Sequence, residues 1–126
     1  MTWQYDHTHF KCSDPEKTVA FFTEHFGATV VSRSASGAMP ITTLEIGGLW
    51  YNFSPRREGE SVNRPSGPAY GIYHMALRTK DLEAEAAKLK ARGVKFTLDV
   101  TQPSPAMKMA FVEGPDGISI ELLQRN

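Results

Sequence analysis

Apolar and polar positions follow two kinds of pattern along this chain, and the same order of patterns occurs twice. Residues 5–12 and 71–79 mix apolar and polar side chains without a helical period, which predicts two strands. Each is followed by a stretch in which apolar residues recur three or four positions apart, which predicts an amphipathic helix. The expected apolar faces are Val19, Phe22 and Phe26 in the first helix and Leu82, Ala86 and Leu89 in the second.

Both predicted helices carry matching start and stop signals. Asp14 and Asp81 suit the N-cap position, because a carboxylate there accepts hydrogen bonds from unpaired helix amides. Pro15 suits the first helical position, where a missing N–H costs nothing. Gly27 and Gly93 suit the helix ends, because glycine tolerates the left-handed conformation that closes a helix. The distance from aspartate to glycine is thirteen positions in the first half and twelve in the second.

A β-rich stretch and then a hairpin follow each helix. The stretches are Ala28–Arg33 and Val94–Val100; the hairpins pair Ile41–Ile46 with Leu49–Phe53 and Met107–Val112 with Ile118–Leu123. Each half is therefore expected to contain a strand, a helix and about three further strands. The predicted fold class is α+β, with one domain over residues 1–126. Its parts are module one at about 4–54, a connector at about 55–69 that is rich in proline, glycine and charge, and module two at about 70–124.

Laying the second half over the first pairs His7 with His74. Each histidine precedes the capping aspartate of its half by seven positions. The overlay also pairs Asn52 with Glu121, because each lies four residues after the last turn glycine. Successive side chains of a strand point to opposite faces, so Asn52 and Glu121 should lie opposite the apolar residues that bury against the helices. The same alternation places His9 on the face of His7.

Two imidazoles and a carboxylate from different strands suit a divalent metal such as Zn²⁺, Ni²⁺, Mn²⁺ or Fe²⁺. His7, His74 and Glu121 are the predicted ligands, and three ligands leave positions open for water and substrate. The alternative is that these histidines make ordinary hydrogen bonds at the surface or in the core. That alternative is preferred for His25, in the middle of a predicted helix.

Composition narrows the function classes. The 126 residues include 14 Lys+Arg and 14 Asp+Glu, so the basic excess of a nucleic-acid binder is missing. The longest uninterrupted aliphatic and aromatic run, Val19–Phe22, is far shorter than a membrane span. The first residues have neither the basic nor the apolar part of a signal peptide, and a single cysteine, Cys12, fits a reducing cytoplasm. The expected partner is therefore a small molecule of the cytoplasm, not nucleic acid or membrane.

At these residues the sequence resembles the vicinal oxygen chelate superfamily, which includes glyoxalase I, epimerases, fosfomycin-resistance proteins, extradiol dioxygenases and bleomycin-binding proteins. The resemblance covers nearly the whole chain. It rests on Asp6-His7, on Ser13-Asp14 leading to Gly27-Ala28, on Tyr73 through Leu77, and on Phe111 through Pro115-Asp116-Gly117 to Leu122. It implies two βαβββ modules forming a half-open barrel around one divalent metal per site, and a homodimer whose sites are shared between chains.

The resemblance also implies that His7, His74 and Glu121 match three ligands of the family pattern. Position 52 departs from that pattern, since glyoxalase I-like enzymes have a carboxylate there. Asn52 is a fourth ligand, a substrate hydrogen-bonding group or a bystander; an amide cannot act as a general base. This departure argues against a symmetric proton shuttle between two carboxylates.

Glyoxalase I-like lyase or isomerase chemistry, on a small substrate chelated through neighbouring oxygens, is the first expectation. Glu121 and His9 are the candidate acid–base residues. Substrate-binding candidates are Asn52, Trp50, Met107 and Met109. The alternatives are an Fe(II) ring-cleaving dioxygenase with the same ligands and a metal-free, ligand-sequestering protein of the bleomycin-resistance type.

Overall fold

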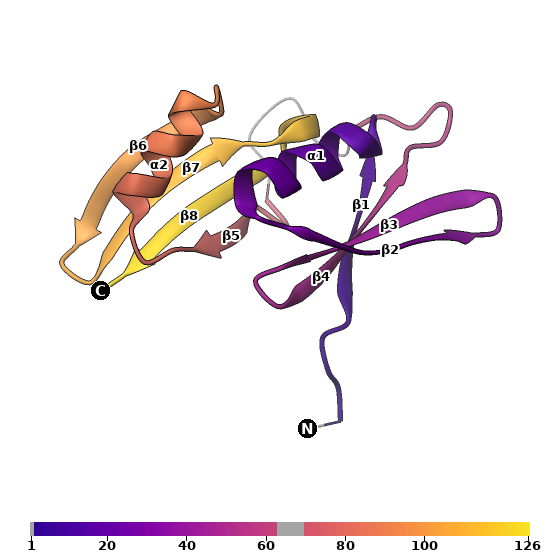
Figure 1. Cartoon of the computed structure of the whole chain (residues 1–126), viewed down its shortest axis with the longest axis horizontal. Coiled ribbons are helices and arrows are strands. Elements are labelled where there is room, and N and C mark those ends of the chain that lie inside the picture. Colours follow the sequence, from indigo (N-terminus) through magenta and orange to yellow (C-terminus); the bar gives the residue numbers. More distant parts are fainter. Residues whose placement is uncertain (1, 63–69) are drawn as a thin grey trace. The chain divides into compact units, whose positions relative to one another are not determined.

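A computed structural model describes residues 2–62 and 70–126 of the chain (Figure 1). The chain divides into two compact units, Met1–Asn63 and Arg64–Asn126, which are called module one and module two below. Each has the element order strand, helix and three strands, which confirms the α+β class and the two βαβββ modules. The boundary falls within the predicted connector at 55–69, of which residues 63–69 lie outside the described part.

Module one is a four-stranded mixed sheet with one helix. Its elements are β1 (His7–Cys12), α1 (Pro15–Phe26), β2 (Thr29–Ser36), β3 (Met39–Ile46) and β4 (Leu49–Pro55). The strands lie in the order β1-β4-β3-β2. β1 runs parallel to β4, and the other neighbours are antiparallel. The first strand of the module therefore pairs with its last.

Module two repeats this topology. Its elements are β5 (Met75–Arg78), α2 (Leu82–Ala91), β6 (Lys95–Ser104), β7 (Met107–Glu113), a short 3₁₀ turn (Pro115–Gly117) and β8 (Ser119–Arg125). The order is β5-β8-β7-β6, and β5 runs parallel to β8. Both sheets therefore bring the first strand of the module beside its last strand. This shared topology agrees with the overlay of the second half of the sequence on the first.

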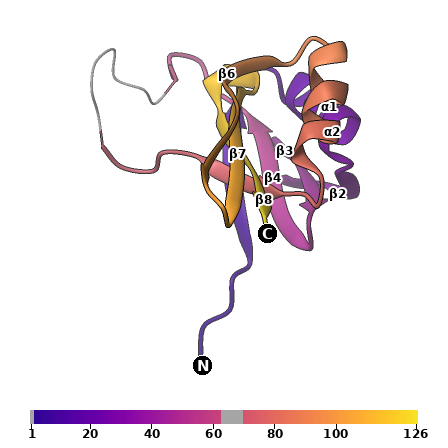
Figure 2. The ribbon, with the colours of Figure 1, turned by 90° about the vertical axis from the view of Figure 1, so that its left-hand side faces the viewer.

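Each helix packs on one face of its own sheet, and the core of each module lies between them (Figures 1 and 2). In module one, Phe22 is fully buried and its ring lies 5.7 Å from that of Phe53. In module two, Leu82, Ala86 and Leu89 are buried, as are Ile120 and Leu122 of β8. Removal of this apolar surface from water is the main term that holds each helix to its sheet.

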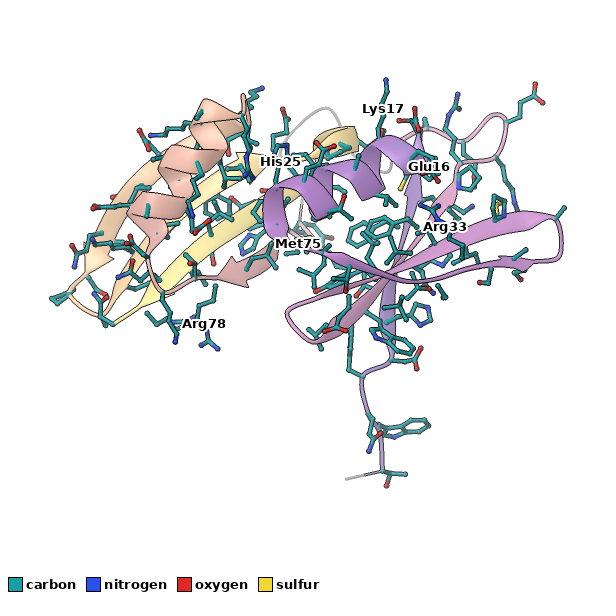
Figure 3. All side chains as sticks on the ribbon, in the orientation of Figure 1. Glu16, Lys17, His25, Arg33, Met75 and Arg78 are labelled. Carbon is teal, nitrogen blue, oxygen red and sulfur yellow. The ribbon has the colours of Figure 1, made fainter. Side chains whose placement is uncertain are left out.

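A polar contact adds to the packing of α1. Arg33, on β2, donates a hydrogen bond to Glu16 of α1 at 2.9 Å and another to Thr42 at 3.1 Å (Figure 3). Arg33 and Glu16 are largely exposed, so this pair contributes little to stability. Residues 33 and 42 are register partners, so their side chains lie on the same face of the sheet, the face on which α1 packs.

The helix ends follow the signals in the sequence. Asp14 accepts a hydrogen bond from the amide of Lys17, and Asp81 accepts one from the amide of Ala84. Gly27 closes α1 in the left-handed region with φ of 66°. In module two the C-cap of α2 is Arg92, and Gly93, at φ of 80°, follows that cap. Within residues 2–62 and 70–126, neither helix has the length and apolar character needed to cross a membrane.

The strands differ from the prediction at several ends. β2 and β3 extend toward each other and meet in a tight turn at Gly37, which the sequence pattern did not single out. β5 is shorter than the predicted 71–79, because Ile72 is fully exposed and, within the described residues, pairing with β8 starts only at Met75. His74 therefore precedes β5 instead of lying within it. Asp116, at φ of 56°, shapes the turn before β8.

Candidate metal centre

One face of each sheet is turned away from its helix and is called the open face below. In module one, the parallel pairing of β1 with β4 aligns His7 with Trp50 and His9 with Asn52. Tyr51 lies on the opposite, buried face, as strand alternation predicts. Both histidines and Asn52 therefore share the open face of module one.

His9 is anchored on this face by a buried hydroxyl group. Its Nε2 lies 2.7 Å from Oγ of Ser54, a residue that is only 2% exposed. Burial lowers the pKa of His9 from its ordinary value, and the neighbouring His7 and Lys11 lower it further. Burial therefore disfavours the charged form of the His9 imidazole, and one of its nitrogens is engaged by Ser54.

His7 has a carboxylate as its partner. Its Nδ1 lies 2.5 Å from Oδ2 of Asp6, the residue just before β1. The ring centroids of His7 and His9 are 6.3 Å apart. With Nδ1 engaged by Asp6, Nε2 is the nitrogen of His7 that is left for a metal.

Asn52 is held by the adjacent strand. Thr43, its register partner on β3, donates its hydroxyl hydrogen to Oδ1 of Asn52 at 2.6 Å. This contact uses one lone pair of the amide oxygen and fixes the orientation of the amide. Its NH₂ group is a hydrogen-bond donor, which suits a substrate oxygen better than a metal ion.

Module two brings His74 and Glu121 together on its open face. Nε2 of His74 lies 3.7 Å from Oε2 of Glu121, and both side chains are largely buried. The ring of His74 is fixed edge-on against Tyr73 and Phe111, at centroid distances of 4.5 and 5.0 Å. Its Nδ1 is buried with no hydrogen-bond partner among the described residues. The pair is therefore preorganised by aromatic packing and by the pairing of β5 with β8.

Further side chains lie on the open face of module two. Phe111 is the register partner of Glu121, and Met109 and Met107 follow at alternate positions of β7. Met107 also accepts a weak contact from Arg125, at 3.8 Å from Nη1 to Sδ. Arg78 projects from β5 on the side away from α2 (Figure 3). Both predicted methionines are therefore on the face of Glu121.

The donor set fits a divalent cation in part. Two ligand atoms about 2.1 Å from one ion, at about 110°, are about 3.4 Å apart. The 3.7 Å between Nε2 of His74 and Oε2 of Glu121 is close to that separation. His7 belongs to the other module. Among residues 2–62 and 70–126, no group of three or more His, Cys, Asp or Glu side chains lies close enough together to hold a metal.

The sequence did not indicate which residues hydrogen-bond to the candidate histidines, namely Ser54 with His9 and Asp6 with His7. Strand alternation predicts that Ser54 shares the face of Asn52, and the same rule would have placed Arg78 with His74, because each pair is separated by an even number of residues. The contact between Ser54 and His9 depends on the parallel register of β1 and β4, which the sequence does not reveal. Asp6 stands directly before His7, but adjacency alone gave no reason to expect a hydrogen bond.

A repeated βαβββ unit with imidazole and carboxylate groups on the open faces of its sheets is typical of a two-module, small-molecule-binding fold. The chain belongs to the Glyoxalase/Bleomycin resistance protein/Dioxygenase superfamily, whose sequence model matches residues 4–122. This membership agrees with the resemblance inferred from the sequence.

Relatives share the whole length of the chain at low identity. The uncharacterized protein YwbC of Bacillus subtilis is 30% identical, with 99% of this chain and 100% of that protein covered. A probable lactoylglutathione lyase of Vibrio cholerae is 27% identical, over 94% of this chain and 88% of that protein. In contrast, the chain spans 44% of the length of glyoxalase I of Saccharomyces cerevisiae.

A solved structure shows the same fold. The fosfomycin resistance protein FosX of Listeria monocytogenes, complexed with Mn(II) and a sulfate ion, superposes with a TM-score of 0.73. The match covers 100% of this chain and 95% of FosX, at 20% identity. At that identity the likeness concerns the fold alone.

Proposed function

We propose that this protein is a divalent-metal-dependent enzyme of the glyoxalase I type, a lyase or isomerase acting on a small substrate that presents two neighbouring oxygens. The observation that carries the proposal is the approach of His74 to Glu121, with Nε2 and Oε2 at 3.7 Å on a largely buried part of the open face. An imidazole and a carboxylate at nearly the separation of two ligands of one ion are typical of a metal site.

His7 is the proposed third ligand. It occupies in module one the position that His74 occupies in module two, and its Nε2 is left available by the contact of Nδ1 with Asp6. The module that completes each site comes from the same chain or from a second copy, and we expect a homodimer in the cytoplasm with shared sites. Zn²⁺, Ni²⁺, Mn²⁺ and Fe²⁺ all accept such ligands.

A bound divalent cation would supply Lewis-acid stabilisation of the negative charge that develops on a chelated substrate oxygen. Glu121 is the only carboxylate of the proposed set, so it serves as ligand and is the group able to carry a proton. Burial lowers the pKa of His9 and so favours its neutral form, which is able to accept a proton. Asn52 donates a hydrogen bond from its amide to the substrate. The two halves of the site would therefore act asymmetrically.

The proposed pocket walls are apolar. Trp50, the register partner of His7, is 46% exposed on the open face of module one, and its ring offers a flat surface to a ligand. Met107 and Met109 offer adaptable apolar contacts on the open face of module two. These side chains exclude water from a substrate held by polar groups at its other end, which is a common arrangement in small-molecule sites.

Metal analysis of protein purified without an affinity tag tests the proposal. We expect roughly one divalent metal per chain, the stoichiometry of a catalytic centre, and its loss in His74→Ala and Glu121→Gln. His25→Gln is the matched control, because it removes a histidine of α1 that is not a proposed ligand. Metal content that is unaffected by His74→Ala contradicts the proposal and favours a metal-free binding protein.

Turnover assays separate the two enzyme classes. Anaerobic turnover with Ni²⁺ or Zn²⁺ of a small substrate that presents two neighbouring oxygens supports the lyase or isomerase. Oxygen uptake with Fe²⁺ and a catechol favours the ring-cleaving dioxygenase instead. Loss of either activity in Glu121→Gln, with the fold retained by circular dichroism, connects the reaction to the proposed site.

A further inference from the structure

The geometry points to Asp6 as the positioning residue that selects the metal-binding nitrogen of His7. This inference rests on the proposed metal site and concerns a residue outside the predicted ligand set. Asp6 immediately precedes β1, and its carboxylate Oδ2 lies 2.5 Å from Nδ1 of His7. A hydrogen bond between an imidazole N–H and a carboxylate is charge-assisted, and such bonds are stronger than those between neutral groups.

The direction of this bond determines the tautomer of His7. An ionised carboxylate only accepts hydrogen bonds, so Nδ1 of His7 must carry the hydrogen and donate it. In a neutral imidazole the other nitrogen, Nε2, is then unprotonated and has a free lone pair. Asp6 thereby presents Nε2 as a ligand, and its negative charge makes that nitrogen a better electron donor, as carboxylate partners of metal-bound histidines do.

The two modules orient their histidines by different means. At the position equivalent to Asp6, module two has Tyr73, whose ring packs edge-on against His74 at 4.5 Å. Phe111 contacts His74 from a second direction, so packing holds that ring, whose Nδ1 has no hydrogen-bond partner in the described part of the chain. Among the described residues, the one ring in contact with His7 is that of His9, at 6.3 Å. His7 therefore depends on Asp6 for an orientation that His74 obtains from aromatic contacts.

Asp6 also lies where substitution leaves the fold intact. Its side chain is 81% exposed, and it lies outside β1, so it contributes little to the core. Changes at this position should act on His7 and not on the packing of the module.

The test measures the affinity of the whole chain for Co²⁺, and the visible absorption of the bound Co²⁺ is the signal. We expect Asp6→Ala to weaken Co²⁺ binding about 10-fold, the lower end of the effect of losing such a partner. Asp6→Asn retains an acceptor oxygen without the charge and should fall between Asp6→Ala and the wild type. Glu45→Gln is the matched control, because it removes a negative charge from the same sheet two strands away from His7, at about 10 Å. It should bind Co²⁺ as the wild type does.

A second readout follows the tautomer directly. Nitrogen-15 NMR of the metal-free protein, above the ordinary histidine pKa of about 6.5, distinguishes protonated Nδ1 from protonated Nε2. We expect His7 to be protonated at Nδ1 in the wild type and to shift toward the Nε2-protonated form in Asp6→Ala. A structural change without a positioning effect would not alter this signature.

His7→Ala distinguishes a failure of the proposed metal site from a failure of the proposed role of Asp6. If Co²⁺ affinity is unchanged in His7→Ala, the proposed metal site is wrong and the role of Asp6 is overturned with it. If His7→Ala abolishes binding while Asp6→Ala leaves affinity and tautomer unchanged, the metal site stands and the positioning role alone is overturned.

Discussion

Nε2 of His9 lies 2.7 Å from the hydroxyl oxygen of Ser54, a side chain that is almost completely buried. The two residues come from β1 and β4, and 45 positions of the chain separate them. Their contact ties the strand that carries both candidate histidines of module one to its parallel neighbour.

Removal of this hydroxyl should weaken module one. Ser54→Ala leaves Nε2 of His9 without its partner, and we expect a loss of about 1 kcal/mol in the free energy of unfolding. Urea denaturation followed by circular dichroism measures it. Ser34→Ala, on the exposed edge strand β2, is the control and should change stability by less than about 0.5 kcal/mol. Equal stability of Ser54→Ala and the wild type would show that the hydrogen bond contributes nothing.

Asn52→Asp tests the departure at position 52. An aspartate retains an acceptor for the hydroxyl of Thr43 and adds a negative charge to the face of His7 and His9. If that face binds a divalent cation as proposed, its affinity should rise by about 10-fold, which corresponds to about 1.4 kcal/mol. Titration of the metal-free protein with Zn²⁺ measures the change. An affinity that stays the same or falls places residue 52 away from the ion.

The aromatic core of module one is the most sensitive point for stability. Phe22 is fully buried and contacts the rings of Phe21, Phe26 and Phe53. We expect Phe22→Ala to cost about 3–5 kcal/mol, because it removes buried surface and leaves a cavity. Phe26→Ala, at a partly exposed position of the same helix, should cost less. The midpoint and slope of urea unfolding together give both values, and the reverse order would refute this account of the core.

Asp99 provides a pH-dependent contact on the surface of module two. The hydrogen bond from Lys90 at 2.6 Å, followed by that from the amide of Val100, holds the pKa of Asp99 below its ordinary value. A lowered folded-state pKa adds stability above the unfolded-state pKa, and this contribution is lost as the pH falls through the folded-state value. We expect Lys90→Ala to raise the pKa of Asp99 toward its ordinary value, measured by NMR titration. Lys88→Ala, which removes the ion pair with Glu85, should leave the pKa of Asp99 unchanged.

The sequence was sufficient for the elements and their faces wherever local chemistry decides them. Asp14 and Gly27 mark the ends of α1, because capping involves only neighbouring residues. Strand alternation placed Asn52 on the open face, because the apolar residues on either side of it must be buried.

Contacts that depend on strand register were not predictable. The alignment of His9 with Asn52, and hence the contact with Ser54, follows from the parallel pairing of β1 with β4. The residue pattern of β1 or of β4 alone does not determine which strand it pairs with or in which register. The short β5 was missed for a similar reason, since residues 71–73 have strand-like character but no partner strand. The predicted ligands His7, His74 and Glu121 remain a proposal.

The pairing of first and last strands also bears on the order of folding. β2, β3 and β4 follow one another through tight turns, so their contacts close short loops, whereas β1 must join β4 across most of the module. Closing long loops costs more chain entropy and slows folding. The strand that bears His7 and His9 is therefore expected to dock late, after β2, β3 and β4 have paired, so the open face of module one is completed in the final step.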